Sequence, residues 1–289
     1  MIPDKKIDAL LDSLHKFKSL RLPYYSQPIH NWVWPEIDAM GLMQESMENF
    51  TNLFISAGLN KTGIDILLSH EIEQCLKTIH PEFNKFILWQ NMLFDRSTGT
   101  VDHYDSWYLD TMPKGYLTGV SIALEDIAEE SGPFRYYPNS HLEFANLKLE
   151  KLNHTQFLEQ IKIYAENNEY KTALLNKGDI LLWHPFLIHG SLSQVKPEFS
   201  RKSLTAHYYP LGVSRKNNDK RVLSSSLKVK ISNALSAFIY PNQFDDYPIY
   251  SGHSKIHLIK FNLKGIYQII KNSIKNQYLV KMDMRRDSY

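Results

Sequence analysis

The triplet His103-Tyr104-Asp105 and the later run 177–189, Lys-Gly-Asp-Ile-Leu-Leu-Trp-His-Pro-Phe-Leu-Ile-His, decide the fold that we expect for this chain. The imidazoles of His103 and His189 and the carboxylate of Asp105 are the ligand set of a facial triad. Such a triad holds a non-haem Fe(II) ion on one side and leaves the opposite coordination positions open. The pattern therefore predicts an iron-dependent oxygenase.

The spacing within the triplet suits a β-strand. Side chains alternate between the two faces of a strand, so His103 and Asp105 share one face while Tyr104 points away. The run 177–189 begins with a turn and continues as apolar residues up to its histidine. We expect this second strand to lie alongside the triplet. An H-x-D triplet alone is a weak motif, so its surroundings carry the argument.

Further blocks extend the pattern from about Phe86 to Pro210. They are 94–97 (Phe-Asp-Arg-Ser), 119–127 (Gly-Val-Ser-Ile-Ala-Leu-Glu-Asp-Ile), 131–134 (Ser-Gly-Pro-Phe), 137–141 (Tyr-Pro-Asn-Ser-His), 189–191 (His-Gly-Ser) and 201–208 (Arg-Lys-Ser-Leu-Thr-Ala-His-Tyr). With these blocks in this order, the chain resembles the phytanoyl-CoA dioxygenase-like branch of the Fe(II)/2-oxoglutarate-dependent oxygenases.

The resemblance implies that His103, Asp105 and His189 ligate iron and that Arg201 pairs with the distal carboxylate of 2-oxoglutarate, assisted by Ser191. A guanidinium grips a carboxylate in a planar, bidentate geometry that lysine does not reproduce. Fe(II), 2-oxoglutarate as cosubstrate and O2 are therefore the expected cofactors.

Three other positions qualify this picture. Gln90, on the expected strand 86–94, is a candidate for hydrogen bonding to the cosubstrate or the substrate. Ser121 stands where many family members carry a tryptophan, so one wall of the cosubstrate pocket departs from the family pattern. Asn139 replaces a turn glycine, which we expect to change only the turn, because asparagine tolerates left-handed backbone conformations.

The remaining histidines near these blocks are not expected to bind metal. By strand parity His184 faces away from His189, and we expect a hydrogen-bonded core or rim residue. His141 and His207 match family positions outside the triad, where a supporting or structural role is expected. The sequence has no nucleophile elbow, phosphate-binding loop or H-E-x-x-H motif, which disfavours hydrolase and nucleotide-binding functions.

Composition fits one domain. The chain has 289 residues, 43% hydrophobic and 12% aromatic, enough for a well-buried β-rich core. Cys75 is the only cysteine, so no intrachain disulfide can form and a reducing compartment is expected. No apolar run reaches the roughly 18 residues of a membrane span, and no apolar stretch follows Met1, so we expect a cytoplasmic protein.

Periodicity divides the single domain 1–289 into three parts. Residues 1–85 form a helical flank, with helices expected at 4–18 and 63–79. Residues 86–210 form the sheet core, interrupted by an insertion at 142–168 that is expected to contain a helix. By the resemblance, such an insertion lies near the mouth of the site. Residues 211–289 form a basic C-terminal extension.

The extension carries a net positive charge that the rest of the chain offsets. From Val213 to Tyr289, 14 Lys and Arg face 5 Asp and Glu, a formal +9. Apolar residues recur there at helical spacing, which predicts a basic amphipathic helix: Ile256, Ile259, Leu263, Ile266, Ile270 and Ile274. We favour packing of this stripe on the core. The alternatives are an anionic membrane surface or attraction of a phosphorylated or carrier-linked substrate.

We therefore predict a double-stranded β-helix, a jelly roll of two antiparallel sheets, with flanking N-terminal helices and a C-terminal helical extension. The resemblance implies a dioxygenase that hydroxylates a C–H bond of a small-molecule or carrier-linked substrate and releases succinate and CO2. Two other classes stay open: a non-redox jelly-roll enzyme that uses another divalent ion, and a binding module of the same fold without turnover. No nucleic-acid partner is expected, and the sequence predicts neither the substrate nor the oligomeric state.

Overall fold

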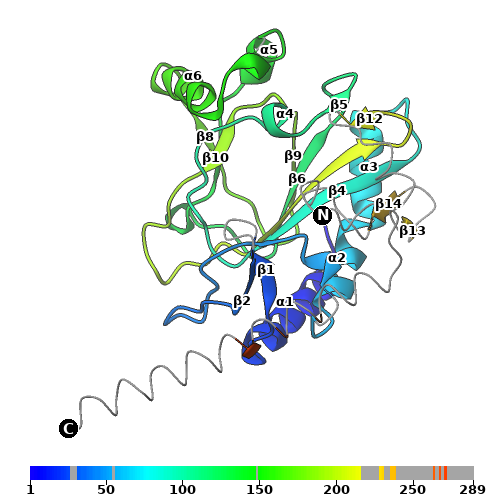
Figure 1. Ribbon diagram of the computed structural model, residues 1–289, viewed down its shortest axis with the longest axis vertical. Helices are drawn as coiled ribbons and strands as arrows, with labels where there is room; N and C mark the ends of the chain where they lie inside the picture. Colours follow the sequence, from blue (N-terminus) through cyan, green and yellow to red (C-terminus); the bar gives the residue numbers. More distant parts are fainter. Residues whose placement is uncertain are drawn as a thin grey trace.

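The computed structural model describes residues 1–26, 31–53, 56–147, 149–215, 228–230 and 235–238, together with positions 263, 267, 270 and 271. Its largest element is a sheet with the strand order β13-β14-β4-β11-β6-β9, in which β3 also pairs with β4. Every pair in this sheet is antiparallel except β14 with β4. A smaller antiparallel sheet has the order β10-β7-β8 and lies across from the large one, near α5 and α6 (Figure 1).

The strands of the large sheet are β3 (Met47–Glu48), β4 (Phe86–Phe94), β6 (Thr118–Ala123), β9 (Ile180–Trp183), β11 (Ser203–Pro210), β13 (Lys228–Lys230) and β14 (Leu235–Phe238), and those of the small sheet are β7 (Phe134–Tyr136), β8 (Lys171–Ala173) and β10 (His189–Ser191). Two short pairs complete the strands, β1 (Tyr24–Ser26) with β2 (Asn31–Val33) and β5 (Thr111–Met112) with β12 (Ser214–Arg215). The helices are α1 (Asp4–Ser19), α2 (Leu59–Leu67), α3 (His70–Ile79), α4 (Asp105–Tyr108), α5 (Ser140–Phe144) and α6 (His154–Glu166), with 3-10 turns at Phe50–Asn52, Glu129–Ser131 and Leu149–Lys151.

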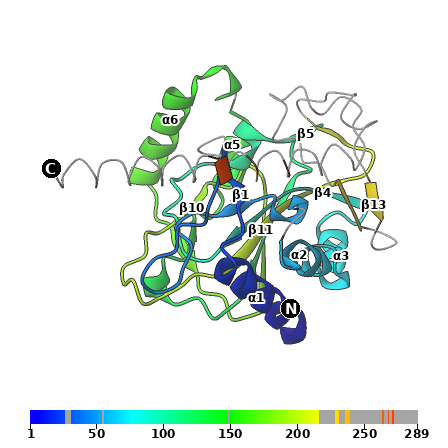
Figure 2. The same cartoon turned by 60° about the horizontal axis from the view of Figure 1, so that its bottom comes forward.

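Helices α1, α2 and α3 cover the outer face of the large sheet (Figure 2). The helix expected at 4–18 is confirmed as α1, and its apolar stripe is fully buried against the sheet: Ile7, Leu10, Leu14 and Phe17. Each such side chain contributes about 1.5–3 kcal/mol of burial free energy. The single helix expected at 63–79 is wrong, because Ser69 adopts an extended conformation and starts a new helix, so the segment forms parts of α2 and α3.

Strand β11 shows how the sequence separates core from site. Leu204, Ala206 and Tyr208 point outward into the core under the helices. Thr205 and His207 alternate with them and line a cavity on the inner face. The polar–apolar alternation of residues 203–208 therefore directs hydrogen-bonding groups to the space between the two sheets.

A second, smaller core lies beneath the insertion. Tyr104, Phe144, Phe157 and Phe186 are buried together there. The expected helix in this segment is confirmed as α6, which begins with a capping box between Asn153 and Gln156.

The C-terminal extension differs from expectation where it is described. Instead of only helix, it contributes strands β13 and β14, which lengthen the large sheet beyond β4. The edge of β4 accepts β14 because β3 pairs only with its other end, at Met92 and Leu93. Most of the predicted amphipathic helix lies outside the described residues.

Two members of its apolar stripe are described. Leu263 and Ile270 are helical and are 50% and 47% exposed, so these two do not pack on the core as favoured above. Among the described residues, no helix has the length and apolarity that crossing a bilayer requires.

Candidate metal centre

The backbone brings the two predicted histidine ligands face to face. His189 is the first residue of β10, and His103 pairs with it as an isolated antiparallel bridge. Each donates its N–H to the carbonyl of the other, at 2.9 Å from His103 and 2.8 Å from His189. The run 177–189 is not one strand as expected, because β9 ends at Trp183 and a turn at 184–187 carries the chain to the other sheet.

The triplet is also not a strand. Asp105 is the first residue of the short helix α4, which closes with a hydrogen bond from the Leu109 N–H to the Asp105 carbonyl at 2.8 Å. Tyr104 still points away from the cavity, into the small core with Phe157 and Phe186. The short helix thus keeps the predicted convergence of the two ligating side chains while changing the backbone that supports it.

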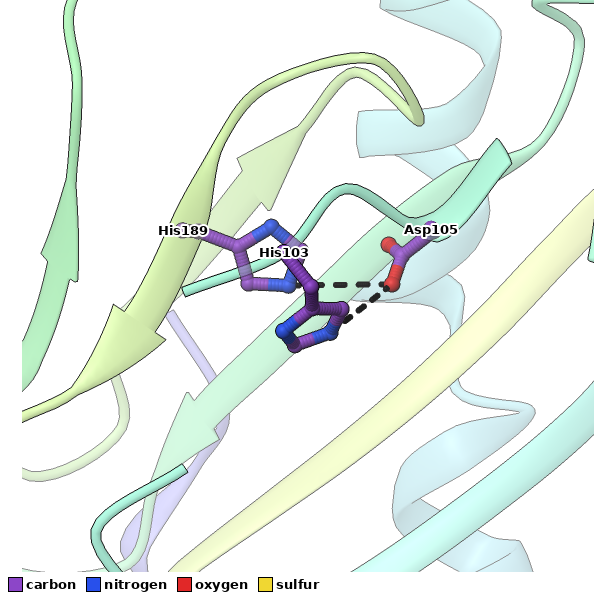
Figure 3. Close-up of side chains that lie close together, drawn as sticks. All are labelled: His103, Asp105 and His189. Atoms are coloured by element: carbon purple, nitrogen blue, oxygen red, sulfur yellow. Dashed lines mark ion pairs between the residues drawn. The ribbon is translucent and has the colours of Figure 1, made fainter. Parts of the chain in front are cut away.

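The three side chains meet around one point (Figure 3). Asp105 Oδ1 lies 3.6 Å from His103 Nε2 and 3.7 Å from His189 Nε2. The three candidate ligand atoms all lie within 4.8 Å of one another. Protein nitrogen and oxygen ligands bind a divalent transition-metal ion at about 2.0–2.2 Å. The space between these three atoms therefore fits one such ion.

Both histidine rings are oriented by backbone carbonyls. His103 Nδ1 lies 2.8 Å from the Val101 carbonyl, and His189 Nδ1 lies 2.9 Å from the Leu187 carbonyl. A carbonyl only accepts, so each Nδ1 carries a proton. Each Nε2 points to the central point, where a neutral ring offers its lone pair to a metal. Phe134 stacks on the His189 ring at 5.2 Å between centroids and fixes it further.

The second oxygen of Asp105 is held by two donors on the large sheet. Trp183 donates from Nε1 at 2.7 Å, and His207 Nε2 lies 3.1 Å from the same oxygen. The indole of Trp183 reaches Asp105 because it lies directly over Gly119, which has no side chain. A Cβ added at residue 119 would lie 2.0 Å from the indole. His207 thus has the supporting position expected for it. Sequence reasoning missed Trp183, because only the pairing of β6 with β9 places it across from the glycine.

The protonation states of His189 and Asp105 suit metal binding. Burial lowers the pKa of His189 to about 4, so its ring is neutral at pH 7. Burial alone also lowers the pKa of His103, but its hydrogen bond to Asp105 and the charge of that residue leave the pKa above its usual value. Burial alone raises the pKa of Asp105, yet His207 and His189 and the hydrogen bonds it accepts bring that pKa well below its usual value, so the carboxylate is ionised.

The cluster opens into a cavity of about 140 Å3. Its walls come from both sheets and from the segment before the triplet: Met92, Phe94, Thr100, His103, Asp105, Phe134, Trp183, His189, Gly190, Ser191, Arg201, Thr205 and His207. The predicted residues Arg201 and Ser191 are therefore both brought to the same cavity as the candidate metal ligands.

Arg201 is a buried cation that has no carboxylate partner among the described residues. It is 7% exposed, its guanidinium carbon lies 5.1 Å from the Phe94 ring centroid, and its Nε has no hydrogen-bond partner among the described residues. Burial lowers its pKa to about 10, which leaves it charged at neutral pH. Ser191 Oγ lies on the same wall and accepts a hydrogen bond from the Thr100 N–H at 2.8 Å. A buried guanidinium without a counter-charge is energetically unfavourable, unless the carboxylate of a ligand pairs with it.

The other candidates lie outside the cavity. Gln90 is opposite His207 in the strand register but does not line the cavity. His184 is an exposed turn residue rather than part of a strand, and its Nδ1 accepts a hydrogen bond from the Phe186 N–H at 3.3 Å. His141 lies near it, with the ring centroids 5.4 Å apart. Asn139 has the left-handed conformation predicted for it, with φ of 66°.

Comparison with known proteins gives consistent matches. The phytanoyl-CoA dioxygenase (PhyH) family model matches residues 1–202. A phytanoyl-CoA dioxygenase domain-containing protein 1 homolog of Caenorhabditis elegans is 26% identical over 126 residues, 41% of this chain and 42% of that protein. Human peroxisomal phytanoyl-CoA dioxygenase is 26% identical over 137 residues, 44% of this chain and 40% of that protein. The matched region thus spans about two fifths of the length of these curated relatives.

Solved structures share the fold. The non-heme alpha-ketoglutarate-dependent carbocyclase SnoK from nogalamycin biosynthesis superposes with a TM-score of 0.56 at 14% identity, over 78% of this chain and 83% of that one. The non-heme monooxygenase ThoJ gives 0.53 at 16% identity, over 94% and 93%. At such identities the likeness concerns the fold.

Proposed function

The chain belongs to the phytanoyl-CoA dioxygenase family, and from this premise we propose that it is an Fe(II)/2-oxoglutarate-dependent dioxygenase. It hydroxylates a C–H bond of a small-molecule or carrier-linked substrate and releases succinate and CO2. One observation carries the proposal. A two-histidine, one-carboxylate cluster and a buried Arg201, whose Nε has no hydrogen-bond partner among the described residues, line the same cavity.

The donor set and the orphaned guanidinium fit the two groups that this reaction needs. His103, Asp105 and His189 hold Fe(II), since a mixed imidazole and carboxylate set with open positions suits non-haem iron. Arg201 pairs with the distal carboxylate of 2-oxoglutarate, and Ser191 assists from the same wall. When bound, iron and 2-oxoglutarate supply the dioxygen-dependent oxidation, while the protein binds and orients both reactants.

The surrounding residues keep this arrangement in place. Trp183 and His207 hold one oxygen of Asp105 and leave the other for the metal. Phe94 and Phe134 supply apolar walls that limit the access of water to the cavity. We also propose that the two facing sheets form a jelly roll, which the shared fold of SnoK and ThoJ supports.

Succinate formation tests the proposal. The full chain, with Fe(II), 2-oxoglutarate and O2, should release succinate, and omission of any one of them should stop the release. Asp105→Ala and His103→Ala should each abolish it. His15→Ala, at an exposed position on α1, is the matched control and should keep full activity.

The same assay separates the alternatives. Metal-dependent turnover of a substrate without 2-oxoglutarate would indicate a non-redox enzyme. Tight metal and 2-oxoglutarate binding without any succinate release would indicate a binding module. Full activity in Asp105→Ala would remove the proposed metal centre.

A further inference from the structure

A row of side chains crosses the inner face of the large sheet and ends at Glu48. In the strand register Ser121, Thr205, Met92 and Glu48 lie opposite one another in this order, on β6, β11, β4 and β3. Residues paired across strands direct their side chains to the same face. Met92 and Thr205 line the cavity, so Glu48 faces the same side as they do.

The neighbouring residue confirms this direction. Met47 is 1% exposed and belongs to the core under the helices, together with Leu93, its partner on β4. Alternation along the strand therefore turns Glu48 inward. Two strand spacings, about 10 Å, separate its backbone from that of Thr205, a distance that a small molecule held over the metal can span.

Glu48 is a half-buried carboxylate that has no partner in the described part of the chain. Among the described residues its side chain forms no hydrogen bond and no ion pair. Burial raises its pKa, since no neighbouring cation compensates the charge. An ionised carboxylate in this position gains a charge-assisted hydrogen bond when a cation arrives.

Gln90 adds a second polar group beside this position. By strand parity it faces the same side as Met92, and its side-chain amide has no partner among the described residues. In the part of the chain that the structure describes, no strand pairs with Gln90 on this edge of β4, since β3 pairs with residues 92–93 and β14 with residues 86–88. Gln90 and Glu48 thus form one polar margin beyond the cavity wall.

One charge inside the cavity and one at its margin favour different ligands. Arg201 lies next to Phe94, at one end of β4, and attracts the dianionic cosubstrate. Glu48 lies at the lateral edge and repels a second anion while it favours a cation. Given the proposed function, we infer that Glu48 and Gln90 form the substrate-side wall of the site. The substrate binds Glu48 through a protonated amine or guanidinium. This differs from the anionic substrate that the basic extension suggested.

Matched six-carbon probes test the inference. The full chain is loaded with Co(II) in place of Fe(II) and with 2-oxoglutarate, and hexylammonium, hexanol and hexanoate are titrated by calorimetry. We expect hexylammonium to bind about tenfold more tightly than hexanoate, the effect of one charge-assisted hydrogen bond. Glu48→Gln should remove the preference and Glu48→Lys should reverse it. Glu82→Gln, an equal charge change at an exposed site after α3, should leave it intact.

The affinity for 2-oxoglutarate distinguishes failure of this inference from failure of the proposed function. Each Glu48 variant should bind Co(II) and 2-oxoglutarate as the wild type does, which also shows that it is folded. If the loaded wild type binds none of the probes or shows no preference, or if Glu48→Gln keeps the preference, the inference is wrong. If the wild type does not bind 2-oxoglutarate with metal present, the proposed function itself fails.

Discussion

His103 and His189 are backbone partners as well as neighbours at the candidate metal centre. Their reciprocal N–H to carbonyl hydrogen bonds, at 2.9 and 2.8 Å, join the segment after β4 to the first residue of β10. Two backbone bonds fix the separation of the two imidazoles before any metal binds. The site is therefore preorganised, and the side chains around it mainly have to orient Asp105.

Trp183→Phe should weaken metal binding without unfolding the protein. The change removes the 2.7 Å hydrogen bond from Nε1 to Asp105 and keeps most of the aromatic surface. Loss of an outer partner of a ligating group typically lowers metal affinity about 10- to 100-fold. Anaerobic titration with Co(II) measures the change. Trp34→Phe, at a residue that is 40% exposed, is the control, and an unchanged affinity in Trp183→Phe would mean that His207 alone orients the carboxylate.

Arg201→Met should weaken 2-oxoglutarate binding and leave stability unchanged or higher. Among the described residues the guanidinium has no carboxylate partner, so its removal breaks no ion pair there and relieves a buried charge. A lost charge-assisted pair corresponds to about a 10- to 100-fold rise in the 2-oxoglutarate dissociation constant. Calorimetric titration of the metal-loaded protein and urea unfolding of the metal-free protein measure the two effects.

Arg201→Lys is the matched control for charge. It keeps the cation but not the bidentate geometry, so we expect an intermediate affinity for 2-oxoglutarate. Wild-type affinity in Arg201→Met would assign the distal carboxylate to another residue. A large loss of stability in that variant would show that Arg201 has a structural partner instead.

Some of this architecture could be predicted because it depends on local patterns. The spacing of Ile7, Leu10, Leu14 and Phe17 is enough to define α1, since only a helix places them on one face. The triad residues could be proposed from residue type and order.

Other features depend on tertiary contacts that no local pattern contains. Asp105 begins a helix, although its spacing from His103 also fits a strand, and residues 63–79 break at Ser69 although their apolar spacing continues. The contact of Trp183 with Asp105 requires the register between β6 and β9. Glu48 becomes notable only once β3 is seen to pair with Met92.

Gly119→Ala tests whether the space over this glycine is what positions Trp183. A Cβ at residue 119 would lie 2.0 Å from the indole, so the ring must move and lose its hydrogen bond to Asp105. We expect a loss of about 1–3 kcal/mol in the free energy of unfolding, as for other overpacked sites, together with weaker Co(II) binding. In the Trp183→Ala background there is no indole for the new methyl group to contact. Gly119→Ala should therefore lower the free energy of unfolding much less there. A double-mutant cycle from urea unfolding gives the coupling between the two residues. If Gly119→Ala lowers the free energy of unfolding equally in both backgrounds, the glycine is required by the backbone of β6. Other contacts would then position Trp183.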